Sequence, residues 1–311
     1  MAVAENVLGA IGNTPLVQLT KVVPPGSARI VVKLEGANPT GNMKDRMAKA
    51  AIAAAQADGR LRPGSTVVEY TGGSTGASLA LVCAAKQYPI KIITSDAFSA
   101  EKTRTTRALG AQITLIPSDN GRITSELITA MIEAARKLSS EPGHWWFDQL
   151  NNRDAAAGYH SMGEEIWTQT GGKVDAFVQA VGSAHSLNGV MESLRRHKPG
   201  LHVVAAEPAE TAVLSGGPKG AHRIEGIGLG FIPPHWRRDD VNEIQSATTQ
   251  EAMEMCRRLA REEGIFVGTS SGLNVIAALR VAKRLGPDAT VATIMIDSGL
   301  RYMSTDLFSP R

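Results

Sequence analysis

Hydrophobic and polar positions divide this chain into short apolar runs that alternate with longer segments of helical spacing. The apolar runs, rich in β-branched residues, lie within 29–36, 66–71, 90–96, 111–118, 174–182, 202–208 and 290–299. Apolar residues recur at helical spacing in segments 43–58, 75–87, 123–138, 155–170 and 250–263. Continuous apolar strands between helices are typical of a parallel sheet covered on both faces. The pattern therefore predicts an α/β fold with right-handed crossovers.

The chain contains no short-period repeat, no low-complexity tract and no long linker of Gly, Ser and Pro. We therefore expect two parallel-sheet units, covered by helices and packed closely against each other. The stretch "LSSEPGHWWF", 138–147, is the best candidate for the switch from one unit to the other.

Composition and charge narrow the classes of partner. The 311 residues are 43% hydrophobic and 20% charged, as in an ordinary globular protein, and the net charge of +3 is small and scattered. No stripe of Lys and Arg suggests a nucleic-acid footprint. No apolar run reaches the ~18 residues of a membrane span, and the first residues lack the pattern of a signal peptide. We expect a cytoplasmic protein that binds neither nucleic acid nor membrane.

The metal-binding residue types form no site in the sequence. Cys83 and Cys256 lie far apart, each within a segment of helical spacing, which suits buried thiols better than a disulfide or a metal site. The seven histidines show no ligand spacing. We therefore expect no bound metal.

Candidate chemistry concentrates in loops that follow the predicted strands. In α/β sheets, ligands bind beyond the carboxyl ends of the strands, where loops run into helix N-termini. Four such loops contain unusual residues: "NPTGNMKDR" (38–46), "YTGGSTGAS" (70–78), "AVGSAHSLNG" (180–189) and "IDSGLRY" (296–302).

Lys44 follows a turn signal and lies in the first turn of a predicted helix. The N-terminal end of a helix carries partial positive charge, so this position and any burial should lower the pKa of the ammonium, as an amine nucleophile requires. Alternatively, Lys44 extends into solvent and pairs with Asp45 or another carboxylate. This loop alone leaves both interpretations open.

The loop 70–78 places Gly72, Gly73 and Gly76 between hydroxyl residues at the end of a predicted strand. Glycines let the backbone approach a ligand, and N–H groups at a helix start favour a phosphate or a carboxylate. A tight turn with a capping residue would look similar. Neither a Walker loop nor the GxGxxG dinucleotide fingerprint is present.

Eight motifs, in the same order, resemble the cysteine synthase and cystathionine β-synthase family of pyridoxal-phosphate enzymes. They are "IGNTPLVQL" (11–19), "KLEGANPTGNMKDR" (33–46), "EYTGGSTGASLA" (69–80), "FDQLNN" (147–152), "GEEIW" (163–167), "EGIGLGFIPP" (225–234), "GTSSG" (268–272) and "DSGLRYMST" (297–305). The resemblance covers nearly the whole chain. It implies pyridoxal 5'-phosphate as cofactor and the fold type II architecture, similar to the tryptophan synthase β subunit.

The resemblance also implies roles for individual residues. Lys44 matches the lysine that holds the cofactor as an internal aldimine and then, once freed, takes the α-proton of the substrate. Backbone N–H groups of one loop would bind the substrate carboxylate, and this loop comprises Thr71, Gly72, Gly73, Ser74 and Thr75. Gln149 matches a glutamine that faces the same carboxylate. Ser298 matches a serine that hydrogen-bonds the pyridine nitrogen, an arrangement that favours loss of a β-leaving group over transamination.

Two residues of the carboxylate loop depart from the family pattern. Ser74 replaces an asparagine whose amide bonds the 3'-oxygen of the cofactor, so that contact is lost, bridged by water or rebuilt elsewhere. Gly72 replaces a serine and removes a hydroxyl near the substrate.

The phosphate cradle also departs from the family pattern. In place of the family's "GTGGT", this chain has Gly182, Ser183, Ala184, His185 and Ser186. The N–H groups of the loop can still bind phosphate if Ala184 and His185 avoid conformations that only glycine tolerates, and the two serines keep the hydroxyls. For His185 three interpretations stay open. It packs as an ordinary loop residue, or it donates to the cofactor phosphate, or it has a catalytic or substrate-sensing role.

The leading hypothesis is an enzyme that replaces the leaving group of an activated serine, O-acetylserine or O-phosphoserine, through an α-aminoacrylate. The product would be cysteine or a related β-substituted alanine. One alternative is net β-elimination by a cysteine desulfhydrase or a serine or threonine dehydratase. The other is a non-catalytic relative that acts as a sensor or complex partner.

The resemblance further implies a homodimer whose chains each have two domains. We expect a smaller, mobile domain at 46–147 that carries the substrate loop and closes over a small amino-acid substrate. The larger, cofactor-binding domain would comprise 1–45 and 148–311.

Overall fold

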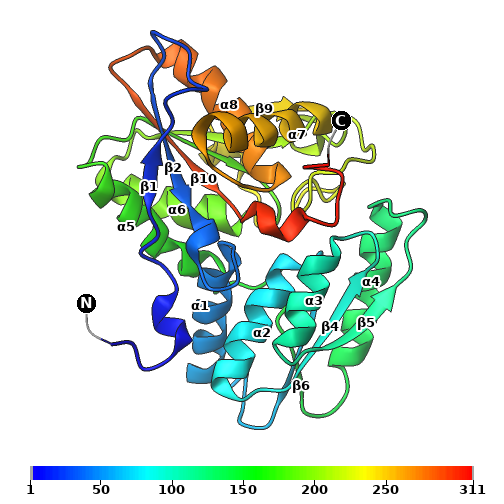
Figure 1. The fold of residues 1–311 in the computed structure, drawn as a ribbon. Coiled ribbons are helices and arrows are strands. Elements are labelled where there is room, and N and C mark those ends of the chain that lie inside the picture. The colour runs from blue at the N-terminus through cyan, green and yellow to red at the C-terminus, as the bar shows by residue number, and fades with distance from the viewer. Residues whose placement is uncertain (1–2, 310–311) are drawn as a thin grey trace.

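The computed structural model describes residues 3–309 and contains two sheets, each covered by helices (Figure 1). The larger sheet has the order β1 (Leu16–Gln18), β2 (Arg29–Leu34), β10 (Thr290–Met295), β7 (Ala176–Ala180), β8 (His202–Pro208), β9 (Glu243–Ala247). The smaller sheet has the order β5 (Gln112–Ile116), β4 (Ile90–Ser95), β3 (Thr66–Tyr70), β6 (His144–Trp146). All pairings are parallel except that of β1 with β2. The predicted α/β fold with two parallel-sheet units is confirmed.

The longer helices follow the strands in the manner that the periodicity predicts. They are α1 (Lys44–Ala57), α2 (Ser74–Lys86), α3 (Ala100–Ala108), α4 (Ser125–Ser139), α5 (His160–Gln169), α6 (His185–His197), α7 (Thr249–Arg258) and α8 (Thr269–Leu285). Short turns of helix are η1 (Val7–Ala10), η2 (Glu35–Ala37), η3 (Ala156–Tyr159), η4 (Val213–Ser215), η5 (Arg238–Asp240), η7 (Gly299–Tyr302) and the π-helical η6 (Leu259–Glu263). The stretch 138–147, predicted to connect the two units, also contributes a strand, because residues 144–146 form β6, which pairs with β3.

Each sheet buries side chains on both faces, because successive residues of a strand point to opposite sides. In β7, Phe177 packs into the core cluster that contains residues of α5 and α6, whereas Val178 packs into the cluster of α7 and α8. In β3, Val67 joins residues of α1 and α2, and Val68 joins residues of α4. The strands are continuous apolar runs in the sequence because both faces of each sheet are covered.

The domain limits at residues 46 and 147 stay a prediction.

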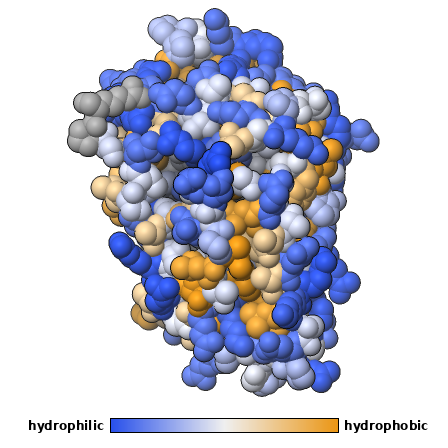
Figure 2. Space-filling view, turned by 90° about the vertical axis from the view of Figure 1, so that its right-hand side faces the viewer, coloured by the Kyte–Doolittle hydropathy of each residue, from blue (hydrophilic) through white to orange (hydrophobic). Residues whose placement is uncertain are grey.

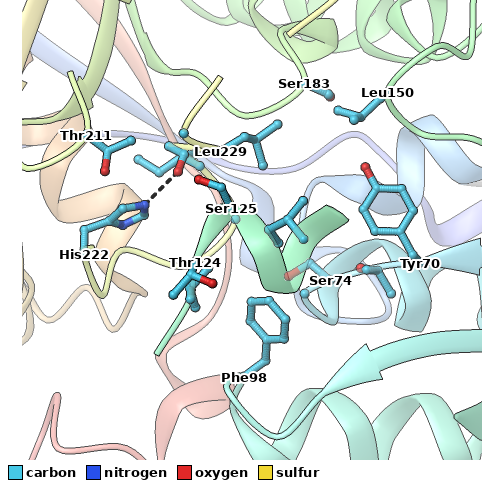
Figure 3. A pocket seen from close by; sticks show the side chains of 18 of the residues that line it. Tyr70, Ser74, Phe98, Thr124, Ser125, Leu150, Ser183, Thr211, His222 and Leu229 are labelled. Atoms are coloured by element: carbon cyan, nitrogen blue, oxygen red, sulfur yellow. Dashed lines mark hydrogen bonds between the residues drawn. The ribbon is translucent and has the colours of Figure 1, made fainter. Parts of the chain in front are cut away.

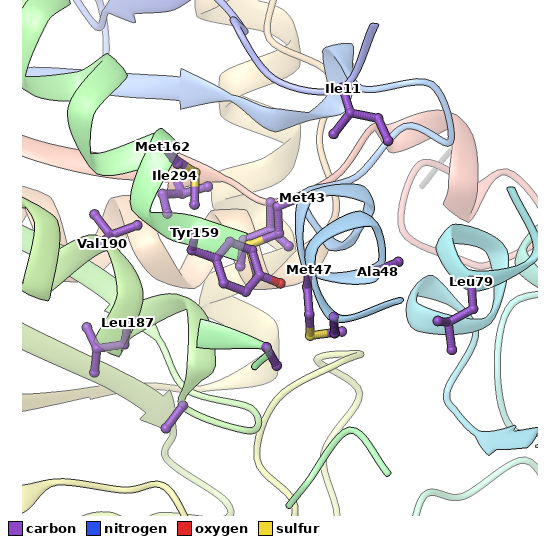
Figure 4. Close-up of a cluster of buried hydrophobic side chains, with 14 of the residues drawn as sticks. Ile11, Met43, Met47, Ala48, Leu79, Tyr159, Met162, Leu187, Val190 and Ile294 are labelled. Atoms are coloured by element: carbon purple, nitrogen blue, oxygen red, sulfur yellow. The ribbon is translucent and has the colours of Figure 1, made fainter. Parts of the chain in front are cut away.

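Helix α1 lies at the centre of the molecule and carries Lys44 at its first position. Its buried face supplies Met47 to the core, close to Tyr159 (Figure 4). The contact is close because Gly158 has no side chain: a Cβ there would lie 2.7 Å from the carbonyl oxygen of Arg46. The start of α1 is therefore fixed against the larger sheet's helices.

A buried ion network also holds the start of α1. The guanidinium of Arg46 bonds to both carboxylate oxygens of Glu35, at 2.8 Å each, and to those of Glu165, at 2.7 and 2.8 Å. Glu165 also accepts from Lys33, at 2.7 Å. Planar guanidinium groups bind carboxylates in this two-point manner with fixed geometry. The network therefore fixes the orientation of the helix that presents Lys44.

The face of the molecule seen in Figure 2 is mainly hydrophilic and carries an apolar region. Hydrophobic residues gather on the lower half of that side, where the smaller sheet and its helices lie. The edge strand β5 exposes Leu115, which is 51% accessible. None of the described helices is long and apolar enough to cross a membrane.

Candidate active site

A cavity of about 290 Å³ lies where loops from both sheets meet (Figure 3). Among the residues that line it are eight predicted from the sequence or close to them in the chain: Lys44, Tyr70, Thr71, Gly72, Ser74, Thr75, Gln149 and Ser183. The cavity is at the lower end of the size range for small-molecule sites. The structure therefore brings together loops that lie up to 139 positions apart in the chain, counted from Lys44 to Ser183.

Lys44 lines this cavity with its pKa lowered to about 8. Burial of the ammonium is the main cause, and the carboxylate of Asp297 opposes it. Asp45 does not serve as the partner of Lys44, because its carboxylate accepts from the backbone and the hydroxyl of Thr40. The lowered pKa predicted for Lys44 is confirmed, and burial, one of the two causes expected, is the principal one.

The carboxylate loop forms the turn between β3 and α2. Gly73 adopts a φ of +117°, and a Cβ there would lie 2.6 Å from the Cβ of Lys102, so only glycine fits. Thr71 accepts the N–H of Gly73 with its hydroxyl, at 2.9 Å. The first N–H groups of α2, from Ser74 onward, have no acceptor within the helix. This end of α2 can therefore bind a carboxylate.

Gln149 supports this loop with both ends of its side chain. Its Oε1 accepts from the hydroxyl of Thr75, at 2.8 Å, and its Nε2 donates to the carbonyl of Tyr70, at 2.8 Å. One proton of Nε2 stays free to face the cavity. Gln149 thus fixes the loop, and direct contact with a substrate carboxylate stays a prediction.

Ser74 accepts a hydrogen bond from Arg301, which the sequence did not indicate. The Nη2 atom of Arg301 donates to the Ser74 hydroxyl oxygen, at 3.3 Å, while Nη1 of the same guanidinium donates to the carbonyl of Thr40. Because the hydroxyl oxygen accepts from a cation, its own proton remains available to a ligand in the cavity.

The loop 182–186 turns from β7 into α6, as the sequence predicts. A Cβ at position 182 would lie 2.5 Å from the carbonyl oxygen of Gly226, which explains the glycine. Ala184 has φ +69° and ψ −11°, in the left-handed region that glycine normally occupies. The condition stated for Ala184, that it avoid a conformation favoured by glycine, is therefore not met. Alanine adopts this conformation at a cost of about 1 to 2 kcal/mol.

The imidazole of His185 contacts residues outside the loop 182–186. Its Nε2 donates to the carbonyl of Gln149, at 2.8 Å, and its ring lies 4.5 Å from that of His235. Burial, the neighbouring His235 and Lys44 lower its pKa to about 4, although the bond to Gln149 opposes this, so the ring is neutral at pH 7. This geometry favours the packing interpretation over an ionic bond to phosphate.

The two serines of this loop differ in their partners. Ser183 lines the cavity, whereas the hydroxyl oxygen of Ser186 accepts a bond from Gln179. Ser298 lies at the start of η7, where its hydroxyl accepts from the N–H of Leu300, at 3.3 Å. Ser298 does not line the cavity, and its predicted contact with the pyridine nitrogen stays a prediction.

Several residues of the site were missed because the signal is spatial. Lys102, on α3, is 2% exposed and its Nζ lies 2.6 Å from a carboxylate oxygen of Glu225 and 4.2 Å from the ring centre of Tyr302. Asp297 is buried, and its Oδ2 accepts from the Tyr302 hydroxyl, at 2.9 Å. Phe98 and Tyr70 also line the cavity. Lys102 and Phe98 lie outside every motif quoted above, whereas the other residues named here lie within one.

The described cysteines take no part in this site. Cys83 and Cys256 are free and buried, and burial raises the pKa of each thiol to about 12. Neither is a nucleophile at neutral pH.

Comparison with known proteins defines the class. The family model described as pyridoxal-phosphate dependent enzyme matches residues 7–297, so the chain belongs to this family. It is 40% identical over 308 residues to a cysteine synthase of Staphylococcus aureus, covering 98% of this chain and 97% of that protein. The predicted family, its cofactor and an enzymatic role are confirmed.

Solved structures agree with this assignment. The cysteine synthase of Entamoeba histolytica superposes with a TM-score of 0.92 at 36% identity, covering 100% of this chain and 92% of that one. The O-acetylserine dependent cystathionine β-synthase of Helicobacter pylori superposes with a TM-score of 0.92 at 33% identity, covering 99% and 100%.

The residues present fit pyridoxal 5'-phosphate. The phosphate loop presents N–H groups from Gly182, Ser183 and Ala184 that bond to no described backbone carbonyl, followed by the free N–H groups at the start of α6. Such an array at a helix N-terminus binds phosphate. A lysine with a partly neutral amine, Lys44, lines the adjoining cavity. The chain thus supplies both N–H groups that can bind the cofactor's phosphate and an amine that can hold the cofactor covalently.

Proposed function

We propose that this protein is a cysteine synthase that acts on O-acetylserine. The observation that supports this most strongly is the position of Lys44, which lines one cavity with the first residues of α2 and with Ser183, in the loop before α6. In the reaction the bond from Cβ to the acetate oxygen breaks, a bond from Cβ to sulfur forms, and acetate leaves with the electron pair. O-acetylserine and sulfide thus give cysteine and acetate.

Lys44 would hold the cofactor covalently, and the N–H groups of the loop 182–186 would hold its phosphate. When bound, the cofactor supplies an electron sink that stabilises negative charge at the substrate Cα. Ser183 lines the cavity and can add a hydroxyl donor to the phosphate. The Ser74 hydroxyl, which accepts from Arg301, can donate to the cofactor ring's oxygen.

Once freed, the Lys44 amine would take the proton from the substrate Cα. A pKa of about 8 leaves roughly one amine in ten neutral at pH 7, enough for a base and still able to return the proton. The negative charge of Asp297 raises the pKa of Lys44 and so favours the ammonium. It therefore stabilises the protonated state after proton transfer.

The N-terminal end of α2 would bind the substrate carboxylate. Thr71 and Gly73 fix the turn, and Gln149 holds Thr75 and the end of β3. Carboxylates are stabilised at a helix start by N–H groups and by the helix dipole. The substrate Cα would thereby be held beside Lys44 with its β-substituent directed toward the rest of the cavity.

Product analysis tests this function. Purified holoenzyme is incubated with O-acetylserine, with and without sulfide, and products are identified by mass spectrometry. We expect cysteine and acetate in equal amounts, and Lys44→Ala should abolish both. Pyruvate as the main product in the presence of sulfide would instead establish the β-elimination alternative. Gln56→Ala, on the outer part of α1, is the control that should retain activity.

We further propose a homodimer located in the cytoplasm. The free, buried thiols are consistent with a reducing compartment. Size-exclusion chromatography with light scattering would give the mass of the assembly, and a monomer at micromolar concentration would contradict the proposal. Fractionation of the source cells would test the location.

A further inference from the structure

One side of the cavity is apolar. We call it the apolar wall, and it consists of Tyr70, Phe98, Ile123, Ile128, Leu150 and Leu229. Four of these side chains belong to the core cluster under α4, and the other two pack against it. Figure 3 shows Tyr70, Phe98 and Leu229 around the same space. The apolar wall is therefore the surface of a packed core and will not be displaced at low energy.

Gly72, which stands where the family has a serine, lies behind one residue of the apolar wall, Phe98. A Cβ at position 72 would lie 2.8, 3.1 and 3.2 Å from three atoms of the Phe98 ring. The ring therefore lies directly against the Cα of Gly72, and a hydroxymethyl group cannot occupy that space while the ring is there. At this point of the cavity an aromatic face stands in place of a polar side chain.

If the proposed function holds, the apolar wall faces the group on the substrate Cβ and the incoming nucleophile. The carboxylate is held at the start of α2 and the Cα beside Lys44, so the group on Cβ points to the remaining space. Among the leaving groups of activated serines, an acetyl group offers a single methyl group to an apolar surface and a phosphate offers none. The incoming thiol is the reactant that can carry an apolar body.

We propose that this cavity accepts, besides sulfide, an organic thiol with an apolar body, aromatic or branched aliphatic, as nucleophile. Phe98, with Gly72 behind it, determines this specificity. The product is an S-substituted cysteine: the Cβ–O bond breaks, acetate leaves with its electron pair, the Cβ–S bond forms, and the thiol proton is released. No oxidant or reductant is required. The proposal rests on the proposed function.

The experiment compares nucleophiles on the same holoenzyme. With O-acetylserine saturating, kcat/KM is measured for sulfide, for 2-mercaptoethanol and for benzyl mercaptan by mass spectrometry of the three products. Each buried methylene is worth roughly fourfold in binding. We expect kcat/KM for benzyl mercaptan to exceed that for 2-mercaptoethanol by about tenfold or more.

Three variants assign the effect to the apolar wall. Phe98→Ala should lower the ratio of benzyl mercaptan to 2-mercaptoethanol about tenfold, through loss of apolar contact. Leu229→Ser, at a half-buried position, should lower the same ratio several-fold and covers the case in which the first variant does not fold. Leu115→Ala, on β5 and outside the cavity, should leave the ratio unchanged.

The outcomes separate this inference from the proposed function. Cysteine from sulfide, together with a ratio near one in the unchanged protein, would overturn the inference and leave the function standing. A high ratio that neither Phe98→Ala nor Leu229→Ser lowers would also overturn it. If no acetate is released from O-acetylserine, the proposed function fails and the inference fails with it.

Discussion

The protonation state of Lys44 yields a prediction that needs no cofactor. Its pKa of about 8, against 10.5 for an unperturbed lysine, means that at pH 7 about one amine in ten is neutral. At a pKa of 10.5 the neutral fraction would be roughly one in 3,000. Burial therefore raises the concentration of reactive amine roughly 300-fold at neutral pH.

Competitive labelling measures this directly. The apoprotein is treated with a trace of acetic anhydride at pH values from 6 to 11, and acetylation of Lys44 is read by peptide mass spectrometry. Exposed Lys137, on α4, serves as the internal reference. We expect the labelling of Lys44 to reach half of its plateau near pH 8.

The same shift has a consequence for stability. The folded protein loses the Lys44 proton near pH 8, whereas the unfolded chain keeps it to about pH 10.5. Unfolding therefore takes up a proton between these values, and the free energy of unfolding contributed by Lys44 rises with pH in this window. A labelling midpoint near pH 10.5 would refute the account, because the amine would then be an ordinary solvated lysine.

Three further predictions concern the surroundings of the site. Ala184→Gly should raise the free energy of unfolding by up to about 1 kcal/mol, since it removes a left-handed alanine at some loss of chain entropy; a lower urea midpoint would contradict this. Glu225→Gln should destabilise by about 3 kcal/mol because it leaves Lys102 buried and unpaired, and the double variant with Lys102→Met should recover most of the loss in thermal unfolding. His185→Phe should keep the dissociation constant of the cofactor at pH 7 within about threefold and cost about 1 kcal/mol of stability for the lost bond to Gln149; release of the cofactor would show that the imidazole binds the phosphate.

The sequence predicts those features that repeat locally. Strands and helices follow from periodicity, and the loops that surround the cavity follow from the rule that ligands bind beyond the carboxyl ends of parallel strands. Lys44 could be assigned because its loop is one of eight motifs that resemble the family, whereas its turn signal and helix start alone left two interpretations open. These features need no knowledge of which distant residues meet.

The features that the sequence did not predict depend on contacts between distant segments. Lys102 meets Glu225 across 123 positions, and no pattern in either segment names the partner. Phe98 fills the space beside Gly72, so the glycine appeared in the sequence only as a missing hydroxyl. The sequence left open whether Ala184 adopts a left-handed conformation, which the folded loop imposes at a modest penalty for alanine.

Reduction of the holoenzyme with borohydride tests the central claim most directly. Three lysines line the cavity, Lys44, Lys102 and Lys219, so the identity of the modified lysine is informative. After incubation with pyridoxal 5'-phosphate, reduction and digestion, we predict a phosphopyridoxyl group on the peptide that contains Lys44 and on neither of the other two. Attachment to Lys102 or Lys219, or no attachment at all, would contradict the assignment of this cavity as the cofactor site.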